Sequence, residues 1–208
     1  MPAAASTSSS PELAAADRTA SSTLVDGAGG GQVGGAGGDE PTTVALPKTS
    51  ESPQLLRIRH SMSHVMAMAV QKLFPKAQVT IGPWTESGFY YDFDSPDPFT
   101  EADLKAIKKE MIRIINRKLP LERIEVSRAE AETKIKAQNE PYKLEILAGI
   151  QEPITLYTLG EEWWDLCAGP HVANTSELNA KAFELESVAG AYWRGDEKNA
   201  QQIGRAHV

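Results

Sequence analysis

Residues 52–74 read SPQLLRIRHSMSHVMAMAVQKLF, and this stretch organises the rest of the predicted fold. Ser52 is a good N-cap, and Pro53 would stand at the first helical position, where its missing N–H is no loss. The helix is expected to end before Pro75, because proline disfavours helical backbone in the residue before it. Apolar residues recur at helical spacing and form the predicted core stripe: Leu55, Leu56, Met62, Met66, Ala69, Val70 and Leu73.

The same helix carries His60 and His64, four residues apart. On a helix this spacing places two side chains on one face, here beside the apolar stripe. Cys167 and His171 repeat the spacing about a hundred residues later, and Gly169-Pro170 between them predicts a tight turn that presents both side chains together. The combination of the two pairs is more informative than either pair alone.

Two kinds of site need such residues. The first is a structural or catalytic zinc site, with neutral imidazoles and a thiolate as ligands. The second is a metal-free pocket in which the imidazoles, Lys143 and Asp165 position an attacking water. Lys143 would by default be a solvated helix lysine. Asp165 follows two tryptophans, so we expect it in a partly dry place with a partner.

Helices and strands follow one another in mixed order, which predicts an α+β fold with a mixed, largely antiparallel sheet packed against helices. Capping-box residues open a second helix at Thr100 and a third at Ser127, and a short helix over 141–148 carries Lys143. The predicted strands are 79–81, 89–93, 121–126, 154–158, 163–166 and 182–187.

Residues 1–51 are rich in Ala, Ser and Gly and are predicted to be a disordered tail, because they offer little apolar surface to bury. A transit peptide would be rich in Arg and poor in acids. Residues 1–46 instead hold five acids and only Arg18, which favours a cytoplasmic protein over a plastid one. The remaining roughly 150 residues are enough for one domain.

Charge and cysteine content restrict the function further. The chain has a formal net charge of −7. A domain that held nucleic acid by itself would normally be basic, so any nucleic-acid partner must be held partly by something else. The single cysteine excludes an internal disulfide and suits a reducing compartment. The sequence contains no apolar run of the ~20 residues that a membrane span requires.

Several motifs, taken in order, resemble the editing domain of the bacterial-type threonyl-tRNA synthetase family, in its cyanobacterial or plastid branch. They are His60-x-x-x-His64, Ile81-Gly-Pro83, Gly88-Phe-Tyr-Tyr-Asp92, Tyr142-Lys143, Asp165-Leu-Cys-Ala-Gly-Pro-His171 and Gly190-Ala-Tyr-Trp-Arg-Gly-Asp196. The resemblance spans about residues 46–199, so we expect an editing domain over 52–199 after the tail.

The resemblance implies an aminoacyl-tRNA synthetase of protein biosynthesis, a threonine–tRNA ligase, whose editing domain hydrolyses mischarged seryl-tRNA(Thr). Proofreading is needed because one missing methyl group gives a synthetic site only ~1–3 kcal/mol of discrimination. The expected partner is the acceptor end of tRNA(Thr) carrying serine, and the parent enzyme is expected to be a homodimer. No membrane partner is expected.

The resemblance also assigns the site to six residues: His60, His64, Lys143, Asp165, Cys167 and His171. His60 and Lys143 are expected to orient or activate the water and the terminal ribose hydroxyl, and the other four to shape the pocket and bind the seryl group. The family's editing site is usually described as metal-free. The related alanyl-type domain binds zinc through the same two pairs, so His60, His64, Cys167 and His171 are the alternative zinc ligands.

The family that this chain resembles continues, after the position of Asp196, into a catalytic domain and an anticodon-binding domain. Residues 203–208 instead read IGRAHV, which is one reading frame of a common sequencing adapter. We therefore expect residues 200–208 to be a truncated end with adapter read-through. The ATP, magnesium and zinc sites of the parent enzyme would lie in the missing catalytic domain.

Two other functions fit the residues. The chain could be a free-standing trans-editing aminoacyl-tRNA deacylase, with or without zinc. It could also be a non-catalytic tRNA-binding module, for which replacement of His60 or Lys143 would leave deacylation unchanged.

Amplification of the gene past codon 202 tests the expected truncation. The reading frame should continue into catalytic-domain sequence in place of residues 203–208. A natural stop codon after Val208 would refute the truncation and favour the free-standing deacylase.

Overall fold

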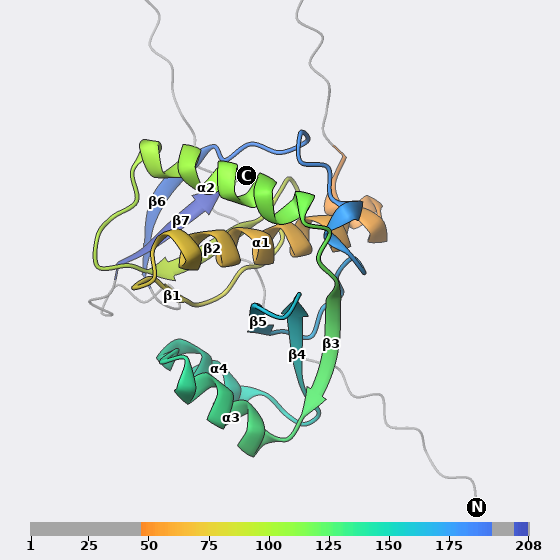
Figure 1. The fold of residues 1–208 in the computed structure, drawn as a ribbon, viewed down its shortest axis with the longest axis vertical. Coiled ribbons are helices and arrows are strands. Elements are labelled where there is room, and N and C mark those ends of the chain that lie inside the picture. The colour runs from red at the N-terminus through yellow and green to blue at the C-terminus, as the bar shows by residue number, and fades with distance from the viewer. Residues whose placement is uncertain (1–46, 193–201, 208) are drawn as a thin grey trace, which may run out of the picture. The chain divides into compact units, whose positions relative to one another are not determined.

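A computed structural model describes the backbone of residues 47–192 and 202–207, and side chains up to residue 190 (Figure 1). The predicted disorder of residues 1–46 and the last residues of the Gly190–Asp196 motif lie outside the described part. Among the described residues, none of the helices combines the length and hydropathy that a membrane span requires.

The helix α1 spans Pro53–Leu73 and contributes many residues to the main hydrophobic core (Figure 1). Its predicted start is confirmed: the Ser52 hydroxyl accepts the Leu55 N–H at 3.2 Å, and Pro53 stands at the first helical position. The last helical residue is Leu73 and Phe74 is the C-cap, so the helix ends before Pro75, as predicted.

The buried surface of α1 is wider than the predicted stripe. Every residue from 61 to 70 is buried, His64 included, whereas Leu73 is exposed. The physical reason is that α1 contacts α2 (Glu101–Asn116) and also the strands β1 (Gln78–Val79) and β2 (Tyr90–Asp94). A helix enclosed by several elements buries most of its surface, polar residues among them.

Seven strands form two sheets in the described part of the chain, and the α+β prediction is confirmed. The larger sheet has the order β1-β2-β7-β6, with β6 at Ser187–Tyr192 and β7 at Gln202–His207. The smaller has the order β3-β4-β5, with strands Leu121–Val126, Ile154–Leu159 and Trp163–Leu166. All paired strands in both sheets are antiparallel.

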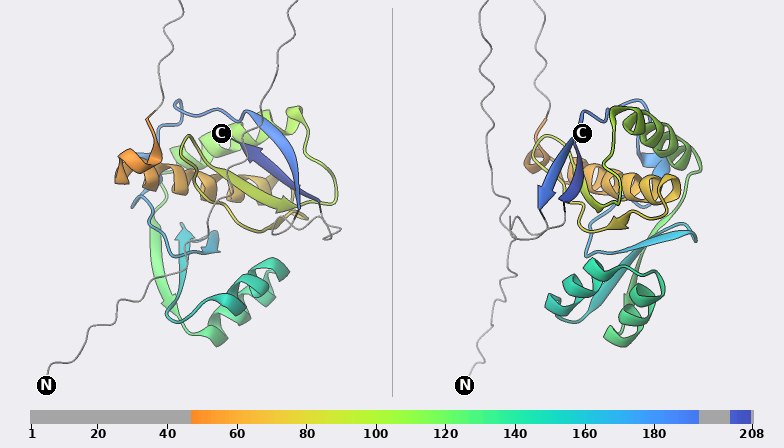
Figure 2. Two further views of the ribbon diagram at one scale, coloured as in Figure 1. Left: turned by 180° about the vertical axis from the view of Figure 1, so that it is seen from behind. Right: turned by 90° about the vertical axis from the view of Figure 1, so that its left-hand side faces the viewer.

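Two shorter helices lie side by side next to the small sheet, α3 at Arg128–Ala137 and α4 at Pro141–Gly149 (Figure 2). They share a separate apolar core made of Ala131, Ile135, Leu147 and Ile154. The predicted capping boxes at Thr100 and Ser127 are both present, so sequence rules placed the starts of α2 and α3 correctly. Two single-turn 3₁₀ helices complete the described elements, η1 at Thr49–Glu51 and η2 at Thr175–Glu177.

Two predicted strands differ from the structure. The strand predicted over 182–187 is wrong, because β6 begins only at Ser187. Phe183 and Leu185 pack on the main core, which accounts for the apolar and polar alternation of residues 182–186. Within the part of the chain that the structure describes, however, this segment pairs with none of the strands. The strand predicted over 79–81 also differs, because the observed strand β1 covers only Gln78–Val79.

Residues 47–49, which precede the predicted start of the domain at residue 52, contact the domain. Thr49 in η1 is buried, and its hydroxyl accepts a hydrogen bond from the buried Arg59 guanidinium. Arg59 also donates to the carbonyl oxygens of Pro47 and Glu86. The Arg59 side chain on α1 therefore holds residues 47–49 against the domain. The composition of the tail does not predict this contact.

The backbone of residues 202–207 forms β7, which pairs with β2 on one side and β6 on the other. Sheet pairing is made by backbone groups and imposes few demands on side-chain identity. The predicted truncation after residue 202 therefore stays a prediction.

Candidate functional site

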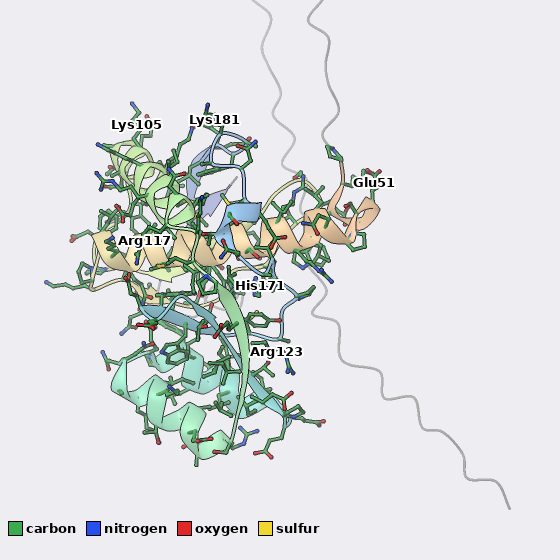
Figure 3. All side chains as sticks on the ribbon, turned by 45° about the vertical axis from the view of Figure 1, so that its right-hand side comes forward. Glu51, Lys105, Arg117, Arg123, His171 and Lys181 are labelled. Atoms are coloured by element: carbon green, nitrogen blue, oxygen red, sulfur yellow. The ribbon has the colours of Figure 1, made fainter. Side chains whose placement is uncertain are left out.

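The six residues proposed from the sequence come from four separate elements. His60 and His64 lie on α1, Lys143 on α4 and Asp165 on β5, whereas Cys167 and His171 lie on the loop after β5. His171 lies between α1 and the small sheet (Figure 3). The structure brings all six side chains into one cluster, which has a sulfur–imidazole half and an ion-pair half.

The sulfur–imidazole half is centred on Cys167. Its Sγ lies 3.3 Å from His171 Nε2 and 3.5 Å from His60 Nε2, and it accepts the Gly169 N–H at 3.2 Å. The predicted turn is present, with a cis Gly169–Pro170 bond and a positive φ of 80° at Gly169. A Cβ at position 169 would lie 2.5 Å from the Tyr157 hydroxyl, so only glycine fits there.

A second layer of polar groups fixes the imidazole rings. His60 Nδ1 lies 3.2 Å from the carbonyl oxygen of Pro170, which can only accept, so Nδ1 carries the hydrogen and Nε2 presents a lone pair. His171 Nδ1 lies 3.2 Å from Ser61 Oγ, which also accepts the Val172 N–H at 3.0 Å. Each ring therefore turns its Nε2 towards the thiol.

The ion-pair half is fully buried. Lys143 Nζ forms an ion pair with Asp165 Oδ1 and donates to the Tyr91 hydroxyl at 3.1 Å. The Tyr91 hydroxyl donates to Asp165 Oδ2 at 2.7 Å, and His64 Nε2 lies 3.5 Å from the same oxygen. Lys143 is only 4% exposed, which excludes the default interpretation of a solvated helix lysine.

Tyr91 was not among the candidates, because an aromatic residue in a strand is usually part of the core. Its only sequence signal is its place in the Gly88–Asp92 motif. The ring occupies space that Gly82 leaves open, since a Cβ at position 82 would lie 2.0 Å from it. Two more unpredicted residues contact the rings: Tyr157 lies 4.4 Å from His171 and Trp163 lies 5.5 Å from His64, centroid to centroid.

Burial sets the charge of the cluster. It lowers the pKa of His60, His64 and His171. The His60 ring and the Lys143 ammonium lower the pKa of His64 further. Burial also raises the pKa of the Cys167 thiol to about 12, and the Asp165 carboxylate acts in the same direction. At neutral pH the cluster therefore consists of three neutral imidazoles and a thiol beside one buried ion pair.

The same residues fit a zinc ion. The ligand atoms of His60, His64, Cys167 and His171 all lie within 4.8 Å of one another. Tetrahedral zinc, with bonds of about 2.0–2.3 Å, places its ligand atoms roughly 3.3–3.8 Å apart. The two sulfur–nitrogen distances of 3.3 and 3.5 Å match this spacing, and neutral imidazole is the form that binds metal.

A family model described as "Threonyl and Alanyl tRNA synthetase second additional domain" matches residues 154–203. The chain is 85% identical over 161 residues to a threonine–tRNA ligase of Synechococcus sp. (strain WH7803), a match covering 77% of this chain and 26% of that protein. The resemblance indicated by the motifs is thereby confirmed.

Two further threonine–tRNA ligases show the range of similarity. The one from Parasynechococcus marenigrum is 86% identical over 158 residues, which are 76% of this chain and 26% of the relative. The one from Synechocystis sp. is 71% identical over 161 residues, which are 77% and 27% respectively. The chain thus spans about a quarter of the length of the curated relatives it matches.

The buried ion pair generates a stability prediction. Lys143→Met leaves the Asp165 carboxylate buried without its cation, so we expect a loss of roughly 3–5 kcal/mol in the free energy of unfolding, measured by urea denaturation. Adding Asp165→Asn should recover more than half of that loss, because the uncompensated charge is then gone.

Lys72→Met is the matched control. Lys72 also pairs with a buried carboxylate, that of Glu110, but its side chain is half exposed and Glu110 keeps a second partner in Arg113. This variant should cost less than about 1 kcal/mol. Equal losses in the two lysine variants would contradict a special role for burial at Lys143.

Proposed function

We propose that this chain, a relative of threonine–tRNA ligases along about three quarters of its length, is the part of such an enzyme that hydrolyses seryl-tRNA(Thr). The observation that carries the proposal is the meeting of His60, Cys167 and His171 with the buried Lys143–Asp165 pair. Ester hydrolysis needs a group that takes a proton from water and a positive charge near the developing oxyanion. The cluster offers both.

His60 is the best-placed base. Its pKa is lowered by burial, so the ring is neutral, and the Pro170 carbonyl holds the hydrogen on Nδ1. Nε2, which faces the Cys167 thiol, then carries the lone pair that would take a proton from water. Water then attacks the carbonyl carbon of the seryl ester, the bond from that carbon to the ribose oxygen breaks, and the ribose oxygen receives a proton.

Lys143 is assigned an electrostatic role. Asp165 and Tyr91 fix its ammonium in a site from which water is largely excluded, where a charge acts more strongly than in solvent. It would orient the ribose hydroxyl or stabilise negative charge on the ester oxygen. His64, Asp165, Cys167 and His171 would shape the pocket and bind the seryl group.

The selectivity for seryl-tRNA over threonyl-tRNA must come from steric exclusion of threonine, because serine fits wherever threonine fits. The ring centroids of His60 and His64 lie 4.1 and 4.2 Å from that of His171. Rings this close leave little freedom to move aside for an extra methyl group. We therefore propose that the imidazole cluster rejects threonine sterically.

The proposed partner is the acceptor end of tRNA(Thr). Because the chain carries a net charge of −7, most of the affinity for tRNA would come from the remaining three quarters of the relatives' length. ATP-dependent threonylation, with its magnesium and zinc, and dimer formation would belong to that remainder. A cytoplasmic location is proposed on the acidic composition of residues 1–46.

Zinc-dependent hydrolysis is a second candidate, favoured by the spacing of the four donor atoms. Bound zinc would act as a Lewis acid on the ester carbonyl. His60, His64, Cys167 and His171 would hold the ion, and the Pro170 carbonyl and Ser61 would orient two of the rings from behind.

Single-turnover deacylation tests the first proposal. The chain should hydrolyse seryl-tRNA(Thr) faster than threonyl-tRNA(Thr), and His60→Ala should lose at least about 100-fold of the rate, because the base is gone. Lys108→Ala, which removes a lysine paired with Glu184 on the surface, is the control and should keep the full rate. Unchanged hydrolysis by His60→Ala would point to the non-catalytic tRNA-binding module.

Metal analysis of the purified protein tests the second. Metal-free chemistry predicts no stoichiometric zinc, and full deacylation after dialysis against a chelator. One zinc per chain in the unaltered protein, lost in Cys167→Ala, would instead establish the zinc-dependent mechanism.

A further inference from the structure

A second buried carboxylate, that of Glu140, lies behind the cluster. Glu140 is 5% exposed and is the N-cap residue of α4, the helix that carries Lys143. Its backbone carbonyl accepts the Lys143 N–H at 3.1 Å. The position of the Lys143 backbone is therefore tied to Glu140, although none of the proposed chemistry uses this residue.

The Glu140 carboxylate ends a short chain of hydrogen bonds that run in one direction. The Trp163 indole N–H donates to Gln71 Oε1 at 2.7 Å, and Gln71 Nε2 donates to Glu140 Oε1 at 2.5 Å. The backbone N–H of Val79 donates to the other carboxylate oxygen at 3.1 Å. We call Trp163, Gln71 and Glu140 the relay.

The relay contacts the elements that carry the site. Gln71 lies on α1, seven residues after His64, and Trp163 lies on β5, two residues before Asp165. The Trp163 ring also packs edge-on against His64, with centroids 5.5 Å apart. The relay is therefore linked to His64 by a ring contact, to Asp165 along β5, and to Lys143 by a backbone hydrogen bond.

We propose that Gln71 and Glu140 are positioning residues for the reaction at the cluster, and that the ionised form of Glu140 is the one that orders the relay. The kinetic part of this proposal rests on the deacylase function proposed above. The structural part, the order of the relay itself, does not.

Counting donors and acceptors explains why ionisation matters. Each oxygen of the ionised Glu140 carboxylate accepts a hydrogen bond, one from the Gln71 amide and the other from the Val79 N–H. Every donor in the relay then faces an acceptor. We infer that a proton taken up on Oε1 and directed at Gln71 faces its amide NH₂ group, and that the amide then reverses to accept the proton. The reversed amide then turns its NH₂ group towards the Trp163 N–H, and that hydrogen bond is lost.

The titration of Glu140 falls in an accessible range. Burial raises the pKa of Glu140 to about 7. The Lys143 ammonium and the hydrogen bonds from Gln71 and Val79 lower this pKa, but their combined effect is smaller than that of burial. Asp165 on β5 also raises this pKa, and the Tyr91 hydroxyl on β2 and Lys76 face the same region. A cavity of about 330 Å³ is lined by Gln71, Lys76 and Glu140 among others.

The sign of the pH effect follows. Glu140 is ionised, and the relay ordered, above about pH 7; the relay is lost as the pH falls through that value. Glu140→Gln places an amide NH₂ where the proton would be, so it imitates the protonated form at every pH. The variant and the unaltered chain should therefore differ at high pH and converge at low pH.

Deacylation of seryl-tRNA(Thr) between about pH 6 and about pH 8.5 tests the proposal. At the high end Glu140→Gln should lower kcat about five- to tenfold, the effect of one lost buried hydrogen bond, with KM changed less than about twofold. At the low end the two proteins should agree within about twofold. A loss of kcat that is equal at every pH would show a merely structural role and overturn the proposal.

A double-mutant cycle with Trp163→Phe isolates the relay. Phenylalanine keeps a ring against His64 but has no N–H, so a reversed Gln71 amide meets no opposing donor. Glu140→Gln should then cost less than about twofold in the Trp163→Phe background. Additive effects of the two substitutions would contradict transmission through Gln71.

The matched control is Glu110→Gln. Glu110 is another buried carboxylate, held on α2 by Lys72 and Arg113. Its variant loses a comparable charge away from the relay and should retain the pH profile of the unaltered chain. Circular dichroism of each variant confirms that folded proteins are being compared.

A readout that needs no activity separates this proposal from the proposed function. Trp163→Phe identifies the Trp163 resonance among the indole N–H signals in a ¹H–¹⁵N spectrum. That resonance should shift with a midpoint near pH 7 in the unaltered chain and stay constant in Glu140→Gln. A resonance that does not titrate in the unaltered chain would overturn the relay, whereas an inactive chain with a titrating resonance would overturn only the deacylase.

Discussion

The ion pair between Lys143 and Asp165 is the constraint on which the site depends. Two charges are removed from water here, and such a pair is tolerated only when each member keeps its partner and further hydrogen bonds. Tyr91 supplies one of these bonds to each member, and His64 lies beside the carboxylate. Because Lys143 comes from α4, Asp165 from β5 and His64 from α1, the pair fixes three elements around one point.

The neutral half of the cluster follows from the same burial. Removing imidazoles from water disfavours their charged form, so His60 and His171 stay neutral beside the thiol of Cys167. In His60, the hydrogen bond to the Pro170 carbonyl fixes the ring hydrogen on Nδ1. The result is a site in which imidazole and thiol donor atoms converge beside one buried ion pair, an arrangement suited both to activating water and to holding a metal ion.

The sequence allowed a good part of this to be predicted. Ser52 and Pro53 indicated where α1 begins, and the capping boxes at Thr100 and Ser127 indicated α2 and α3, because these signals act over three or four residues. The strand expected over 182–187 failed for the opposite reason. Apolar alternation shows only that one face packs on a core, and a strand also needs a partner, which nothing local specifies.

For the site, too, local sequence signals were predictable and contacts between distant segments were not. The sequence by itself determined which chemistry was available: the spacings His60–His64 and Cys167–His171, the turn at Gly169-Pro170, and the motifs shared with threonyl-tRNA synthetases. Only the tertiary structure decided that Lys143 is buried against Asp165, that Tyr91 joins them, and that Glu140 is linked to Trp163 through Gln71. These contacts join residues between 22 positions apart, for Lys143 and Asp165, and 92 positions apart, for Gln71 and Trp163. Their energies depend on the exclusion of water from the assembled core, which no local stretch of sequence encodes.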